Sequence, residues 1–176
     1  MQEHKVAKGI EQVLVATART SDADAEADAA PSRERPWVAP AAWTEDPAPR
    51  LMRLATYMAP DPAGPVEVAI TRFGGIVGGE LANINRWRGQ MGLGPIGEDE
   101  LGTSISRFSA AGFDGYEIRI ESPRGVMLAA GVYQKAIDQM WFVRTTVPDA
   151  EVADRFEDAV FGMARSIAGL DNEDDE

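Results

Sequence analysis

The stretch with the most distinctive chemistry runs from Phe73 to Ile96, FGGIVGGELANINRWRGQMGLGPI. Its glycines stand between a predicted strand and a predicted helix, where backbone N–H groups can bind phosphate. The spacing is not G-x-G-x-x-G, however, and the lysine and hydroxyl residue of a P-loop are absent. Glu80 at the helix start would repel a phosphate while favouring the helix dipole. We interpret the glycines as a tight turn that brings the helix close to the sheet, with anion binding as the alternative.

The helix after these glycines carries an unusual set of amide and guanidinium side chains. Trp87 fits its apolar face, and core packing is the expected role of that ring. Arg86 and Arg88 lie on different sides of the helix, so one can pair with a carboxylate while the other faces solvent. Arginine is enriched at interface hot spots. The predicted protein-contact residues are Asn83, Asn85, Arg86, Arg88 and Gln90.

Catalytic residue types are scarce. The chain has no cysteine, which removes disulfides, thiolate metal sites and cysteine nucleophiles together. Its one histidine, His4, lies in a predicted N-terminal extension, so a serine nucleophile in the domain would have no histidine base. The run Glu98-Asp99-Glu100 lacks the loop pattern of a calcium site and is interpreted as a solvated helix start. We predict no catalytic residues, no metal and no cofactor, and an enzyme using carboxylates alone is the least favoured hypothesis.

The aromatic residues suggest a second kind of site. Trp37 and Trp43 flank Pro40 and are predicted to close one end of the core. Trp141 and Phe142 are adjacent in a predicted strand and therefore face opposite sides of a sheet. A cavity of roughly 300 Å³ or more lined by such rings would favour a carrier of a small hydrophobic ligand or lipid. The predicted ligand-lining residues are Trp37, Trp43, Tyr133 and Trp141.

Composition and charge limit the kinds of partner that the sequence favours. The hydrophobic share of 44% is enough for a core, and no run of 18 apolar residues predicts a transmembrane helix. The formal net charge is −12, whereas nucleic-acid binding needs a basic surface, so nucleic acid is not an expected partner. The final six residues hold five of the acids, so the central part of the chain is only mildly acidic.

The chain divides into four predicted parts. Residues 1–18 have helical apolar spacing and no recognisable signal peptide, and residues 19–35 have the Ala, Asp, Glu and Ser composition of a disordered linker. Residues 36–170 form a single predicted domain, followed by an acidic tail at 171–176.

Within the domain, residues 51–58 and 66–73 alternate as two strands of a hairpin. In the first strand, Met52, Leu54 and Met58 are expected on one face, with Tyr57 on the other. A helix over 80–91 follows, stopped by glycine and proline, and residues 98–103 add a short helical turn.

The rest of the domain is predicted to be an antiparallel meander over 113–121, 126–133 and 140–147, with a well-buried middle strand. A long amphipathic helix begins after Asp149, ends at Gly169 and should cover one sheet face. The fold class is therefore α+β, with an antiparallel sheet packed by helices on its faces.

The run EVAITRFGGIVGGELANINRWRGQMGLGPI, with MRLATY before it and MWFVRTTVP and ARSI after it, resembles a family of uncharacterised bacterial proteins of planctomycete type. That family is associated with lipoproteins and exported proteins, which implies a cell-envelope location. The element order is similar to the PsbP/Mog1-like α/β/α fold, whose members mostly bind other proteins. This chain departs from a lipoprotein, because it has neither a lipobox cysteine nor a recognisable signal.

These observations favour a non-enzymatic protein-interaction or accessory domain whose partner is another protein. A small-ligand or lipid carrier is the alternative.

Overall fold

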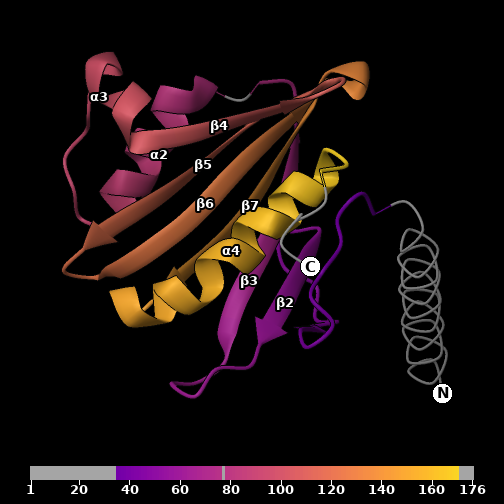
Figure 1. The fold of residues 1–176 in the computed structure, drawn as a ribbon, viewed down its shortest axis with the longest axis vertical. Coiled ribbons are helices and arrows are strands. Elements are labelled where there is room, and N and C mark those ends of the chain that lie inside the picture. The colour runs from indigo at the N-terminus through magenta and orange to yellow at the C-terminus, as the bar shows by residue number, and fades with distance from the viewer. Residues whose placement is uncertain (1–34, 77, 171–176) are drawn as a thin grey trace, which may run out of the picture. The chain divides into compact units, whose positions relative to one another are not determined.

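Within residues 35–76 and 78–170, the part of the chain that the computed structural model describes, one mixed α+β domain is seen (Figure 1). It belongs to the second of two units, Met1–Pro36 and Trp37–Glu176. The predictions for residues 1–18, for most of the 19–35 linker and for the 171–176 tail lie outside the described residues.

The described strands form a seven-stranded antiparallel sheet in the order β1-β2-β3-β7-β6-β5-β4. The strands are β1 (Thr44–Glu45), β2 (Ala55–Ala59), β3 (Val66–Gly74), β4 (Ile105–Ala110), β5 (Phe113–Ser122), β6 (Gly125–Gln134) and β7 (Gln139–Val147). The described helices are α2 (Gly79–Gln90), α3 (Glu98–Ser104) and α4 (Ala150–Ile167), and a short 3₁₀ turn, η2 (Lys135–Ile137), joins β6 to β7. None of these helices is long and apolar enough to cross a bilayer.

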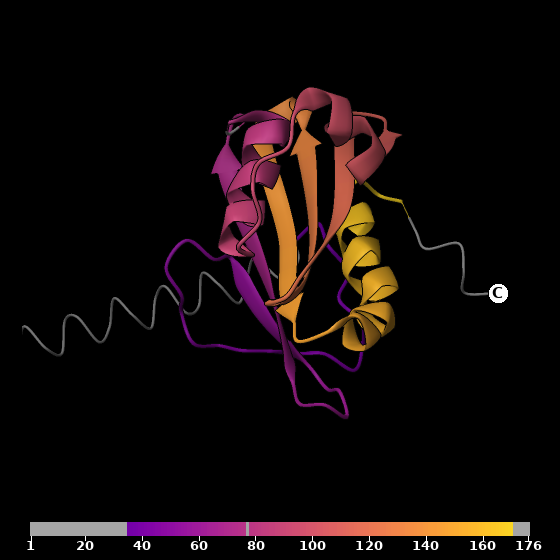
Figure 2. The same ribbon diagram turned by 90° about the vertical axis from the view of Figure 1, so that its left-hand side faces the viewer.

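Helices lie on both sides of the sheet, as the sequence predicted. Figure 2 shows α2 on one side of the strands and α4 on the other. After β3 the chain runs through α2 and α3 and then forms β4 at the far edge of the sheet. The position beside β3 is taken by β7, which comes later in the chain. In Figure 1, α4 crosses β6 and β7, while β5 and β4 extend beyond it.

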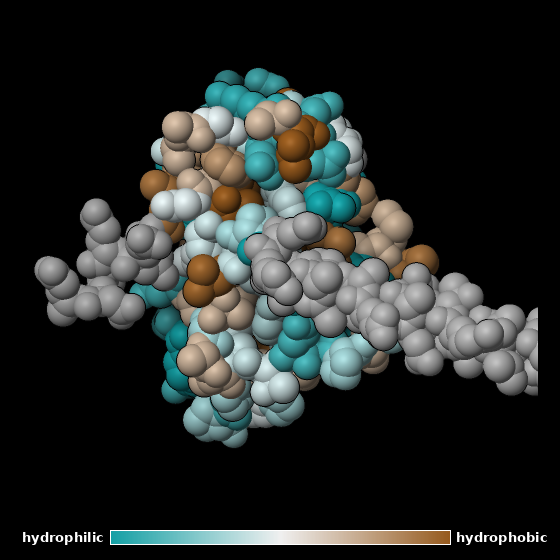
Figure 3. Space-filling model, turned by 90° about the vertical axis from the view of Figure 1, so that its right-hand side faces the viewer, coloured by the Kyte–Doolittle hydropathy of each residue, from teal (hydrophilic) through white to brown (hydrophobic). Residues whose placement is uncertain are grey.

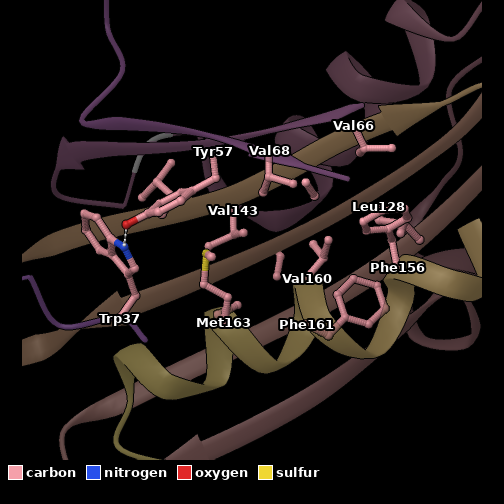
Figure 4. Close-up of a cluster of buried hydrophobic side chains, with 14 of the residues drawn as sticks. Trp37, Tyr57, Val66, Val68, Leu128, Val143, Phe156, Val160, Phe161 and Met163 are labelled. Atoms are coloured by element: carbon pink, nitrogen blue, oxygen red, sulfur yellow. Dashed lines mark hydrogen bonds between the residues drawn. The ribbon is translucent and has the colours of Figure 1, made fainter. Parts of the chain in front are cut away.

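The α4 face carries the larger core. Asp149 caps the helix by accepting a hydrogen bond from the Val152 N–H at 3.0 Å, which confirms the predicted start. The helix buries an apolar stripe against β2, β3, β6 and β7 (Figure 4). At one end of this core the Trp37 indole donates a hydrogen bond to the Tyr57 hydroxyl at 2.8 Å. The labelled members are Trp37, Tyr57, Val66, Val68, Leu128, Val143, Phe156, Val160, Phe161 and Met163.

The α2 face carries a second core built around Trp87, which packs against the rings of Phe142 and Tyr116 at 5.6 and 6.4 Å between centroids. Trp141 and Phe142 therefore do face opposite sides of the sheet. The 113–147 meander is confirmed, and its middle strand β6 is buried along all but its last two residues.

The first predicted strand was wrong in extent and orientation. Residues 51–54 form a turn in which Met52 adopts a φ of 67°, and the side chains of Leu51, Met52 and Leu54 are exposed. The strand begins at Ala55, and it is Tyr57 that points into the core while Met58 is half-buried. The Tyr57 ring can be buried there because its hydroxyl is hydrogen-bonded to the indole of Trp37.

Candidate functional site

The predicted contact residues on α2 make intramolecular bonds. The Asn85 side chain holds both backbone groups of Ile96, accepting from its N–H at 2.8 Å and donating to its carbonyl at 3.0 Å. Arg88 Nε donates to the Gly94 carbonyl at 2.8 Å. These two side chains fasten the segment that connects α2 to α3.

The other three predicted contact residues also make hydrogen bonds within the domain. Asn83 is 1% exposed and accepts a hydrogen bond from Arg86 at 2.8 Å. Gln90 accepts one from Arg144 at 3.1 Å. Their structural roles are thus accounted for, and a role in partner contact stays a prediction.

The predicted ligand-lining rings do not share one cavity. Trp37 and Trp141 meet edge to face at 6.1 Å between centroids and are 7% and 4% exposed. Trp43 packs beside them against Phe156 at 6.2 Å, on the α4 face. Tyr133 belongs to the α2 face, where its hydroxyl donates to Asp138 at 2.5 Å. The structure brings the three tryptophans together as core and places Tyr133 on the other side of the sheet.

An open groove of about 950 Å³ lies on the α4 face, between α4 and the uncovered part of β4 and β5. Two small side chains, Ser104 at the end of α3 and Ser106 on β4, border it on the side of the sheet edge. Carboxylates of α4, Glu157 and Asp158, stand on the opposite wall. The groove exists because α4 packs mainly on β6 and β7 and only partly covers β5 and β4, and residues 38–40 border it as well.

Glu117 on β5 borders this groove and is 7% exposed. One of its carboxylate oxygens pairs with Arg165 of α4, while Oε2 is buried without a hydrogen-bond partner among the described residues. Burial raises the pKa of Glu117, Arg165 opposes that shift, and the nearby acids Glu157 and Asp158 add to it. A buried carboxylate oxygen with no donor favours the approach of a cation.

A second arginine in the groove is already neutralised. Arg119 binds Asp154 and Glu121, each at 2.7 Å, and Glu157 lies 3.7 Å away. The guanidinium is therefore surrounded by carboxylates, and the α4 wall keeps an acidic character.

The edge of the sheet beside the groove is open. β4 pairs with β5 on one side only, and on its other side no backbone hydrogen bond is formed to any described residue. An edge strand of this kind presents alternate N–H and C=O groups to another chain. On the face shown in Figure 3, visible apolar atoms of the described residues lie in separate patches among polar ones.

Sequence reasoning did not identify Glu117 or Ser106. Glu117 occupies an outward position of an alternating strand, which predicts exposure. Its burial depends on Arg165, 48 residues further along the chain, and no local pattern signals that contact.

No model of a protein family matches this sequence, and no curated protein matches it. Among solved structures, the chain is similar to LpqN of Mycobacterium tuberculosis, described as involved in cell envelope biogenesis. The identity is 11%, the TM-score is 0.39, and the match covers 76% of this chain and 79% of LpqN. This match confirms neither the planctomycete-type nor the PsbP/Mog1-like resemblance.

Proposed function

We propose that this protein is a non-enzymatic accessory domain that binds an extended, basic segment of another protein along β4. The observation that carries the proposal is the open edge of β4 beside a groove with an acidic wall. An extended segment can add to such an edge through main-chain hydrogen bonds, while alternate side chains enter neighbouring pockets.

The geometry of β4 explains why the segment should be basic. Ser106 is the cross-strand partner of Glu117, so a residue paired opposite Ser106 would lie two strand spacings, about 10 Å, from the Glu117 backbone. The short serine leaves room above it, and a lysine or arginine side chain can pass over Ser106 toward Glu117 Oε2. Glu157 and Asp158 on α4 add to the attraction for a cation.

The test selects peptides from a random display library on the full chain, without prior depletion, and compares their binding to the Ser106→Trp variant, which places a large ring in the groove beside β4. Thr146→Trp is the matched control, because Thr146 is exposed on β7 and borders neither this groove nor β4. Affinities of the selected peptides are then measured by fluorescence anisotropy.

The proposal expects peptides with strand-forming residues and a lysine or arginine, which bind the wild type and Thr146→Trp alike and lose binding to Ser106→Trp. Replacing the basic residue of the peptide by glutamate should weaken binding by at least about tenfold, the value of one charge-assisted hydrogen bond. Peptides that bind Ser106→Trp equally well, or that show no preference for a basic residue, would contradict it.

A further inference from the structure

A separate hollow of about 440 Å³ lies on the α2 face, where the start of α2 meets the β4–β5 hairpin and the ends of β6 and β7. Its volume falls in the range of small-molecule sites. Apolar parts of the wall come from Ile76, Tyr116, Tyr133 and Met140. None of these four residues borders the groove on the α4 face.

The first residue of α2, Gly79, borders the hollow with bare backbone. Gly78 caps α2 in the left-handed region with a φ of 73°, and Gly79 follows with a φ of 79°. A Cβ added at Gly79 would meet nothing within 4 Å. The glycine turn that the sequence analysis noted thus meets the hollow at Gly79.

The deep end of the hollow has a polar group without a partner. Tyr116 is 3% exposed, and its O–H donates no hydrogen bond to any described residue, while the Asn83 side chain lies within hydrogen-bonding reach of the phenolic oxygen. Burial raises the pKa of this phenol to about 12, with the hydrogen-bonding approach of Asn83 acting in the opposite direction, so the O–H stays protonated and can donate at neutral pH. Buried hydrogen-bond donors in native proteins nearly always have an acceptor, so an unused O–H donor beside a hollow points to a ligand.

The rim of the hollow carries charges that are already paired. Arg107 lies 3.3 Å from Glu80 across the mouth, and Lys135 lies 3.1 Å from Asp114. Because each cation has its own carboxylate, the rim offers no excess charge of either sign. A neutral ligand fits such a rim better than an ion does.

We propose that this hollow binds a small neutral molecule with an apolar ring and a carbonyl group that accepts the hydrogen bond of Tyr116. The aromatic and thioether wall would hold the ring, and the hydroxyl would fix its orientation. The inference concerns the opposite face of the sheet from the groove and does not depend on the proposed function.

The test uses Prodan, a neutral fluorescent naphthyl ketone whose emission reports both the polarity around it and hydrogen bonding to its carbonyl. It is titrated into the full chain and into three variants. Ser109→Trp places a large ring at the mouth, Tyr116→Phe removes the donor, and Thr146→Trp is the control on the same sheet face, outside the residues that border the hollow. Circular dichroism melts establish that each variant is folded.

We expect saturable binding with blue-shifted emission in the wild type and in Thr146→Trp, and loss of binding in Ser109→Trp. Tyr116→Phe should weaken binding about three- to tenfold, the effect of one neutral hydrogen bond. The proposed site would be refuted if the wild type showed no saturable binding, or if Ser109→Trp bound Prodan as tightly as the wild type does. Binding blocked by Ser109→Trp but unchanged by Tyr116→Phe would overturn the assigned carbonyl chemistry.

Discussion

Tyr116→Phe is expected to make the unliganded protein more stable. The wild-type hydroxyl is removed from water on folding, and its O–H donates no hydrogen bond to the described residues. Leaving such a group unsatisfied costs about 1–3 kcal/mol. Removing one oxygen leaves a small void, which costs a few tenths of a kcal/mol at about 24 cal/mol per Å³. The ring keeps its packing on Trp87, so the net gain is about 1–2 kcal/mol.

For a domain of this size that gain raises Tm by roughly 3–8 °C. The assay is thermal and urea unfolding followed by circular dichroism at neutral pH, in protein freed of small molecules by refolding. Tyr57→Phe is the matched control, because the Tyr57 hydroxyl accepts the Trp37 indole N–H at 2.8 Å. That variant should lose about 0.5–1.5 kcal/mol, so the two Tyr→Phe changes are expected to have opposite signs.

The reasoning is refuted if Tyr116→Phe destabilises the protein by about 1 kcal/mol or more, as expected for loss of a satisfied hydrogen bond. The pH dependence supplies an independent check. Because the folded-state pKa of Tyr116 is raised from 10.0 to about 12, the folded state holds this proton more tightly than the unfolded state. Stability should therefore fall as pH rises above 10, and this part of the fall should vanish in Tyr116→Phe.

Three further changes test particular contacts. Burial raises the pKa of Glu117 above its ordinary 4.5, so the contribution of this group to stability increases as pH falls toward that value. Glu117→Gln should therefore flatten that part of the stability–pH curve and raise Tm at neutral pH. Asn85→Ala should cost about 1–3 kcal/mol in urea unfolding, because it removes two hydrogen bonds to the Ile96 backbone, and hydrogen exchange should rise around that residue. Gly115→Ala places a Cβ 2.1 Å from the Phe108 ring, so it should cost about 1–3 kcal/mol unless Phe108→Leu is added to make room.

The elements that the sequence predicted well are those with a clear period and a defined end. In α4, the spacing from Val152 to Ile167 agrees with the cap at Asp149, and in the meander the alternation is broken by recognisable turns. Local chemistry and tertiary packing favour the same structure in both places, so reading the local pattern was sufficient.

The failures have physical causes at particular residues. Residues 51–54 alternate like a strand, but Met52 takes a left-handed backbone in a turn and its apolar neighbours stay in water. β4 was not predicted because Phe108 faces the α4 side while Arg107 and Ser109 face the other, so neither face of the strand is consistently apolar.

The candidate groove could not be predicted for a different reason. Its depth depends on where α4 stops covering the sheet, and the burial of Glu117 depends on an arginine that is distant in sequence. These are properties of the packed domain rather than of any segment.

Hydrogen exchange at the β4 amides tests the proposed function most directly. The rates of residues 105–110 are measured in the full chain, alone and saturated with a selected basic peptide. We expect alternate β4 amides, those that face away from β5, to become strongly protected in the wild type but not in Ser106→Trp. Protection confined to other parts of the domain, with the rates across 105–110 unchanged by the peptide, would contradict it.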